Sequence, residues 1–259
     1  MHTDRESQIV FLTPKGRRVS LRVDENFPSV SDPIRTLAAS GSAEGRAFAA
    51  DYRLPAFVPG APAFSKLKKG RGLRLSLLLR PVVHARNAVL LTALATVSLA
   101  AAMEAVSGKP YTIRWVNEVC DPNGKTVATV DAACSLKPDG YLYYLILEVT
   151  AYLSPRDFPQ RLSDTVTEVF DGIAHGTVGR ISEQLLRVFF PAYENLSYDR
   201  SFIEDYKKRS ILDGRRATLL HNGKRRRVTI LGIDDDARLL VETRKKEVIP
   251  VSSRSELIL

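Results

Sequence analysis

Cysteine and histidine, the residues that build disulfide frameworks and many metal sites, are scarce in this sequence. The 259 residues include two cysteines, Cys120 and Cys134, and four histidines. Two cysteines in so long a chain exclude a disulfide-stabilised scaffold, and we expect both thiols to be reduced and buried. The cysteines and histidines also lack the spacing of zinc ligands, so no metal site is predicted.

Long apolar segments are also missing. The most apolar stretch, residues 88–103, is shorter than the roughly 20 residues that a membrane-spanning helix needs. The polar segment Met1–Arg5 has no apolar core of a signal peptide. We therefore expect a cytoplasmic protein without a membrane partner, in which the apolar stretch forms a helix buried on most sides.

Positive charge is in excess. Lys and Arg number 38 against 29 Asp and Glu, which gives a formal net charge of +9 at pH 7. The chain lacks the helix-turn-helix, zinc-knuckle and aromatic signatures of dedicated nucleic-acid modules, so no DNA-binding domain is predicted. The run Lys224–Arg227 favours either a patch for an anionic partner or a solvated strand whose alternate members point outward. A basic nucleic-acid-binding protein stays open as an alternative function.

Strand-like and helix-like segments are interleaved over the first four-fifths of the chain. This mixture predicts an α+β architecture, a mixed β-sheet with covering helices. The expected strands are two within 8–23, then 73–79, 111–116, 126–132 and 141–153, with 111–116 and 126–132 joined as a hairpin. The expected helices are 33–39, 86–107, 159–172, 177–190 and 198–208.

The last part of the chain has a different pattern. Four short strand-like runs, at 216–220, 226–232, 239–243 and 247–251, are separated by turn signals such as Asn222-Gly223. Closely spaced short strands predict a small β-barrel. We therefore divide the chain into a larger domain at residues 1–209 and a barrel at residues 210–259.

Three stretches of this sequence resemble the biotin protein ligase family and its lipoate ligase relatives. They are Gly72–Pro81, then Arg114–Glu118 with Gly124-Lys125, then Tyr206–Ser210 with Leu231–Asp235. The resemblance runs from about Phe27 to the end. It implies a ligase-like catalytic domain followed by an SH3-like barrel. Active members of the family use ATP and Mg²⁺ to form biotinyl-5′-AMP, and then biotinylate a lysine of a biotin carboxyl carrier protein.

The same resemblance assigns candidate site residues. The family motif Lys-Trp-Pro-Asn-Asp corresponds to residues 114–118, which makes Arg114 and, further along, Lys125 the candidate catalytic residues. The candidate ligand-binding residues are Ser29, Arg53, Trp115, Asn117, Glu118 and Gly124. For Trp115 the interpretation as a packing residue beside the pocket is favoured over that as a stacking platform for a ligand.

Several family motifs are altered. The Gly-Arg-Gly-x-x-Gly-Arg phosphate loop falls on Phe57–Ala63, where no arginine stands and prolines remove N–H donors. The cluster Lys66, Lys68, Lys69 and Arg71 could supply displaced phosphate-binding charge. A later glycine-rich strand falls on 147–152, and there we expect Leu147 and Val149 to fill the pocket.

These losses lead to three functional hypotheses. The first is a degenerate ligase homologue, a pseudoenzyme that binds an active ligase paralogue, a carrier protein or another small molecule. The alternative is an active biotin ligase that needs ATP, Mg²⁺ and biotin, and the third is the nucleic-acid binder. A homodimer is compatible with all three.

Overall fold

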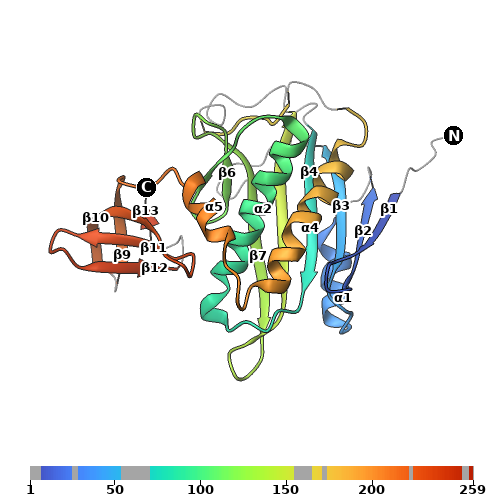
Figure 1. Cartoon of the computed structure of the whole chain (residues 1–259), viewed down its shortest axis with the longest axis horizontal. Coiled ribbons are helices and arrows are strands. Elements are labelled where there is room, and N and C mark those ends of the chain that lie inside the picture. Colours follow the sequence, from blue (N-terminus) through green and yellow to red (C-terminus); the bar gives the residue numbers. More distant parts are fainter. Residues whose placement is uncertain are drawn as a thin grey trace.

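An eight-stranded sheet forms the body of the protein, and a five-stranded sheet lies beside it at the C-terminal end (Figure 1). The computed structural model describes residues 7–24, 29–53, 71–154, 165–170, 174–221, 224–252 and 257–258. Both sheets and the helices that cover the larger one fall within these ranges, so the predicted α+β class is confirmed.

The large sheet has the strand order β1-β2-β3-β4-β8-β7-β6-β5. Strands β2 and β3 pair in parallel, and the other neighbours among the described strands pair antiparallel. Helix α1 (Ser31–Ala39) connects the parallel pair, as parallel strands need a crossover. The bounds are β1 Ser7–Leu12, β2 Arg18–Asp24, β3 Arg46–Arg53, β4 Arg71–Leu79, β5 Thr112–Arg114, β6 Glu118–Cys120, β7 Thr126–Leu136 and β8 Leu142–Ser154.

Helices α2 (Val89–Ser107) and α4 (Thr177–Asn195) pack together on one face of this sheet (Figure 1). Helix α2 follows a short 3-10 turn, η1 (Ala85–Asn87), and ends at Gly108, whose φ of 69° allows a left-handed cap. By length and composition the η1–α2 segment could cross a membrane. Most side chains of α2 are nevertheless buried between the sheet and α4, as expected for a core helix.

The opposite face of the sheet is only partly covered. Helix α1 packs there over the β4–β8 pair through a small apolar cluster formed by Ile34, Ala38, Leu78 and Ile146. Farther along the same strands no described helix covers this face, and its side chains become polar. The candidate site lies there.

The C-terminal sheet has the order β12-β11-β10-β9-β13, and all its pairs are antiparallel. Alternate side chains such as Leu219, Ile230 and Val241 are fully buried, which gives this small sheet its own apolar side. This agrees with the small β-unit expected from the strand spacing and with the SH3-like form that the resemblance implies. The bounds are β9 Arg216–His221, β10 Lys224–Ile233, β11 Leu239–Thr243, β12 Val248–Val251 and β13 Leu257–Ile258.

Some sequence-based expectations were wrong. Residues 165–170, part of the expected helix 159–172, are irregular and form a β-bridge from Val166 to Thr126. The expected hairpin of 111–116 with 126–132 is instead three strands, because a turn at 115–117 returns the chain as β6. Strand β3 was not foreseen. Cys120 is buried as expected, but Cys134 is exposed.

An ion pair joins helix α5 (Phe202–Arg209) to the core helix α2. Arg209 donates two hydrogen bonds to Glu104, from Nη1 to Oε1 at 2.6 Å and from Nη2 to Oε2 at 2.8 Å. Arg209 Nη1 also donates to the carbonyl of Tyr111 at 3.0 Å. The hydrogen bonds from Arg209 hold the pKa of Glu104 below its usual value. The chain leading into the C-terminal sheet is therefore fixed to the body by a charge-assisted contact.

The substitution Glu104→Gln should lower the free energy of unfolding by about 1–2 kcal/mol, because Arg209 loses its charged partner. Since the pKa of Glu104 is lowered on folding, its contribution is present above the usual value of 4.5 and is lost as the pH falls through the lowered value. Denaturant unfolding at neutral and acidic pH measures both effects. Glu204→Gln, in an exposed pair with Lys207, is the control and should cost less. Equal losses in the two variants at neutral pH would contradict this account.

The two thiols should differ in reactivity. Burial raises the pKa of Cys120, with Arg114 acting in the opposite direction, whereas Cys134 is exposed. An aromatic disulfide reagent at mildly alkaline pH should therefore modify one thiol of the folded protein rapidly and the other after unfolding. Cys134→Ser should remove the fast phase, and Cys120→Ser should leave it. A fast phase that survives Cys134→Ser would show that the strand faces are assigned wrongly.

Candidate functional site

The uncovered face of the large sheet carries charged and hydroxyl side chains across its middle strands. We call this the polar sheet face and define it by Arg22, Arg74, Ser76, Asp131, Glu148 and Thr150. Strand register places them together, because Arg74 pairs with Thr150, Ser76 with Glu148, and Asp131 with Glu148. Paired residues of neighbouring strands point to the same side. The side is the one opposite α2 and α4.

Helix α1 begins at the edge of the polar sheet face. Ser29 Oγ accepts a hydrogen bond from the backbone N–H of Asp32, in the first turn of the helix, at 3.3 Å. Ser31 Oγ lies 3.4 Å from Ser76 Oγ on β4. Ser29, a candidate ligand contact from the sequence, is thus placed beside this face and already serves the helix terminus.

Charged groups surround a buried tyrosine at one end of the polar sheet face. Tyr152 on β8 is 4% exposed. Burial raises the pKa of its hydroxyl, Arg74 acts against this, and the negative charges of Glu118 and Asp131 reinforce it. Arg74, Glu118 and Asp131 therefore all act electrostatically on one hydroxyl. Elsewhere on the face, Arg35 of α1 lies 3.6 Å from Glu148.

The motif residue Arg114 is held in a closed network at the end of β5. Its Nη1 donates to Glu118 Oε2 at 2.6 Å and to Thr126 Oγ1 at 3.2 Å, and its Nη2 donates to the carbonyl of Gly124. Thr126 Oγ1 in turn donates to Glu118 Oε2 at 3.0 Å. Glu118 is 8% exposed, so its charge is neutralised within the network. The positive charge of the Arg114 guanidinium and several of its N–H donors are therefore used in contacts within the protein.

The turn after this network presents Lys125. Its backbone N–H donates to Asp121 Oδ1 at 2.7 Å, and Gly124 adopts a φ of 81° that the turn requires. Asn117 follows the Arg114 strand, and its Nδ2 donates to Asp131 Oδ1 at 3.3 Å. Asn117 and Glu118 therefore both lie near the polar sheet face.

Trp115 contacts the C-terminal sheet. Its indole is 1% exposed, and Nε1 donates to the carbonyl of Ala237, in the turn between β10 and β11, at 2.9 Å. The next residue, Val116, accepts a hydrogen bond from the hydroxyl of Tyr206 on α5 at 3.0 Å. The motif therefore joins the two sheets, and Trp115 acts here as the packing residue that the sequence offered as one of two interpretations.

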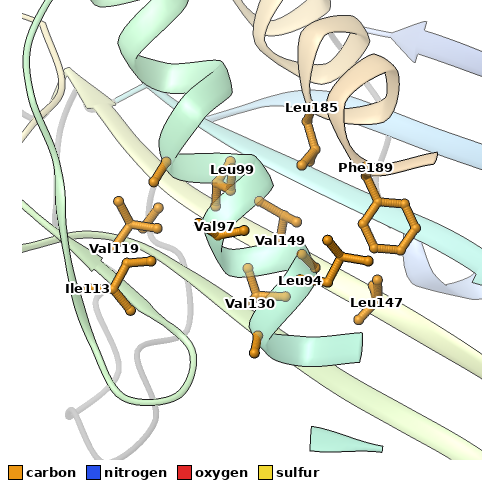
Figure 2. Packing of buried hydrophobic residues seen from close by; sticks show 14 of the residues in the cluster. Leu94, Val97, Leu99, Ile113, Val119, Val130, Leu147, Val149, Leu185 and Phe189 are labelled. Atoms are coloured by element: carbon orange, nitrogen blue, oxygen red, sulfur yellow. The ribbon is translucent and has the colours of Figure 1, made fainter. Parts of the chain in front are cut away.

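The structure overturns one prediction for the pocket. Leu147 and Val149 belong to the core, where they pack with Leu94, Leu185 and Phe189 under α2 and α4 (Figure 2). They lie on the wrong face to fill a cavity on the polar side. The intervening residues, Glu148 and Thr150, are the ones on the polar sheet face. A shift of one residue along a strand exchanges the two faces.

The remaining candidates lie at or beyond the limits of the described chain. Arg53 and Arg71 are register partners at the ends of β3 and β4. Lys66, Lys68, Lys69 and the loop 57–63 lie outside the described residues. Sequence reasoning missed Arg22, Arg74 and Thr126. The alternation Leu73-Arg74-Leu75-Ser76-Leu77 was the available signal, because period-two polarity marks a strand with one apolar and one polar face.

The sequence of this chain is similar to that of a known ligase. The bifunctional ligase/repressor BirA of Bacillus subtilis is 26% identical over 145 residues, which are 54% of this chain and 43% of BirA. The match thus spans less than half of BirA. No family model matches the chain.

Two solved structures share the fold. The biotin protein ligase of Aquifex aeolicus in complex with biotin and ATP is 18% identical with a TM-score of 0.66, over 86% of this chain and 92% of that one. A biotin protein ligase-like protein of unknown function from a Silicibacter species is 16% identical with a TM-score of 0.64, over 97% of this chain and all of that one. This chain is thus similar in sequence to part of BirA, and it has the fold of solved biotin protein ligases.

Proposed function

We propose that this protein is a ligand-binding homologue of the biotin ligases that does not adenylate biotin. The observation that carries the proposal is the network around Arg114, which uses the motif cation for internal contacts with Glu118, Thr126 and Gly124. A binding protein can keep the scaffold without the charge-handling groups that the reaction demands.

The demands of adenylation follow from its charges. A carboxylate must attack an α-phosphate, so cations must offset the charge on both anions and on the departing pyrophosphate. Arg114, paired with a largely buried carboxylate, has little net charge to offer. A planar guanidinium is also a poor substitute for the compact ammonium of the family's lysine. The absence of arginine from residues 57–63 supports the same conclusion.

The polar sheet face does not fit biotin well. Biotin carries a neutral bicyclic ring on an aliphatic acid chain, and apolar groups bind where charges are few. The middle strands of the polar sheet face instead carry Arg74 and Glu148. If the aliphatic chain of biotin covered these two side chains, both charges would lose their hydration, which is energetically unfavourable. These observations favour a small, polar ligand over biotin.

An active ligase is the second candidate function, and Lys125 is the observation that favours it. The resemblance assigns Lys125 as a second catalytic position after Arg114, and Lys125 lies in the turn beside the Arg114 network. In that case ATP, Mg²⁺ and biotin would be required, and the acceptor would be a lysine of a biotin carboxyl carrier protein. For the binding homologue, a carrier protein or an active ligase paralogue is the proposed partner.

The purified protein, incubated with ATP, Mg²⁺ and biotin, lipoate or octanoate, should release no pyrophosphate above the level of a boiled sample. The physical reason is that Arg114, the motif cation, is already engaged by Glu118, Thr126 and Gly124. An active biotin ligase run in parallel is the positive control. Sustained acyl-AMP formation that is lost in both Arg114→Ala and Lys125→Ala would establish the active ligase and overturn the proposal.

The substitution Glu118→Gln should lower the free energy of unfolding by about 2–3 kcal/mol, because it leaves the partly buried Arg114 without its counter-charge. Glu183→Gln, which breaks an exposed pair with Arg187 on α4, is the matched control and should cost at most about 0.5 kcal/mol. Urea unfolding followed by circular dichroism measures both. If Glu118→Gln were as harmless as the control, the network would have no structural role, and its residues would be available for catalysis.

A further inference from the structure

The C-terminal sheet is drawn in orange to red in Figure 1. One of its sides, which we call the outer side, is rich in arginine. Register pairs Arg225 with Leu220, Arg227 with Thr218, and Arg216 with Thr229, so these side chains share one side of β9 and β10. Neighbouring Val228 and Ile230 are buried on the opposite, apolar side. The alternation expected for the run Lys224–Arg227 is therefore present.

This outer side is hollowed. Two adjoining depressions of about 610 and 780 Å³ share Arg227, Thr243 and Arg244 in their linings. Together they are lined by seven cationic side chains and by two carboxylates, Glu242 and Glu247. We call them the basic groove.

The two carboxylates are already engaged. Glu242 pairs with Lys246 at 2.9 Å, and Glu247 lies 3.6 Å from Arg226. The other five cations of the basic groove form no ion pair within the described part of the chain. They are Arg216, Arg225, Arg227, Arg244 and Lys245.

The cations of the basic groove lie close to one another. Diagonal neighbours on adjacent strands, such as Arg216 and Arg227, are about 7–8 Å apart, so their like charges repel each other. The buried side of the small sheet is formed by apolar residues such as Leu219, Ile230 and Val241, and the arginines do not contribute to it. Uncompensated arginines on a hollowed surface are instead suited to carboxylates or phosphates, which they bind in a bidentate manner.

The other residues of the C-terminal sheet indicate whether the groove binds the carboxylates of a protein or the phosphates of a nucleic acid. Residues 210–259 contain no Phe, Trp or Tyr, so the groove offers no platform on which bases could stack. Two exposed apolar side chains stand on the same side of the sheet, at the border of the basic groove. Leu220, the register partner of Arg225, is 41% exposed, and Val248, the register partner of Glu242, is 50% exposed. Arginine combined with exposed aliphatic groups is typical of a surface that binds protein.

We propose that the basic groove of the C-terminal sheet docks an acidic protein surface that presents both carboxylates and aliphatic side chains. The arginines contact the carboxylates, and Leu220 and Val248 supply the apolar contacts. The groove is separate from the polar sheet face, and the proposal holds whether or not the protein adenylates biotin.

Fluorescence anisotropy of labelled probes tests this proposal with the full chain. The probes are a peptide of glutamate and leucine, a peptide of equal length and charge in which serine replaces leucine, and a short DNA duplex. The protein should bind the leucine peptide more tightly than the serine peptide or the duplex. Substituting Leu220→Ser should abolish the preference for leucine over serine.

The charge dependence is tested with two double variants that change the net charge equally. Arg225→Glu with Arg227→Glu should weaken binding of the leucine peptide about tenfold or more, because two groove cations become anions. Arg86→Glu with Lys137→Glu, at exposed positions on the large domain, should change it by less than about twofold. The neutral pair Arg225→Gln and Arg227→Gln should give an intermediate loss and guards against misfolding of the reversed variant.

Two results would overturn the proposal. Equal weakening by the two double variants would mean that only net charge matters. Tighter binding of the duplex, with a steep loss of affinity on adding salt, would assign the groove to nucleic acid instead.

Discussion

The alternation of side chains along β4 and β8 is the constraint on which the rest of this structure depends. Each strand sends every second residue into the core beneath α2 and α4, and the residues between them must face the other side. Leu75 and Val149 are buried as a register pair, and the next pair along, Arg74 and Thr150, faces away. One strand pair thus sets both the apolar core and the chemistry of the candidate site.

The Arg114 network makes the motif at residues 114–118 part of the scaffold. A partly buried cation is kept in place when a buried carboxylate neutralises it, because breaking either member of such a pair is costly. Trp115, the next residue of the motif, also has a structural role, because its indole N–H donates a hydrogen bond to the carbonyl of Ala237 in the C-terminal sheet's β10–β11 turn. The motif that resembles a catalytic centre thus holds the two sheets together.

Much of the fold followed from the sequence, since long apolar or alternating segments determine their own structure. The α2 helix, the β4 and β8 strands and the C-terminal strands were predicted because each has a clear period. The turn at 115–117 and the strand β6 were missed, because three-residue strands carry too little pattern. The prediction that Leu147 and Val149 face the pocket was wrong. A motif aligned by resemblance can be displaced by one residue, and in a strand such a shift exchanges the two faces. Arg74 could have been found from alternation alone, but its proximity to Tyr152 and Glu118 depends on pairing between distant strands.

If the proposed function is correct, the polar sheet face does not bind biotin. Isothermal titration calorimetry of biotin into the full-length protein, with and without MgATP, tests it directly. We predict no saturable heat at biotin concentrations that saturate an active ligase. Saturable binding of one biotin per chain, lost on substituting Arg74 or Thr150 with a bulky apolar residue, would contradict the claim.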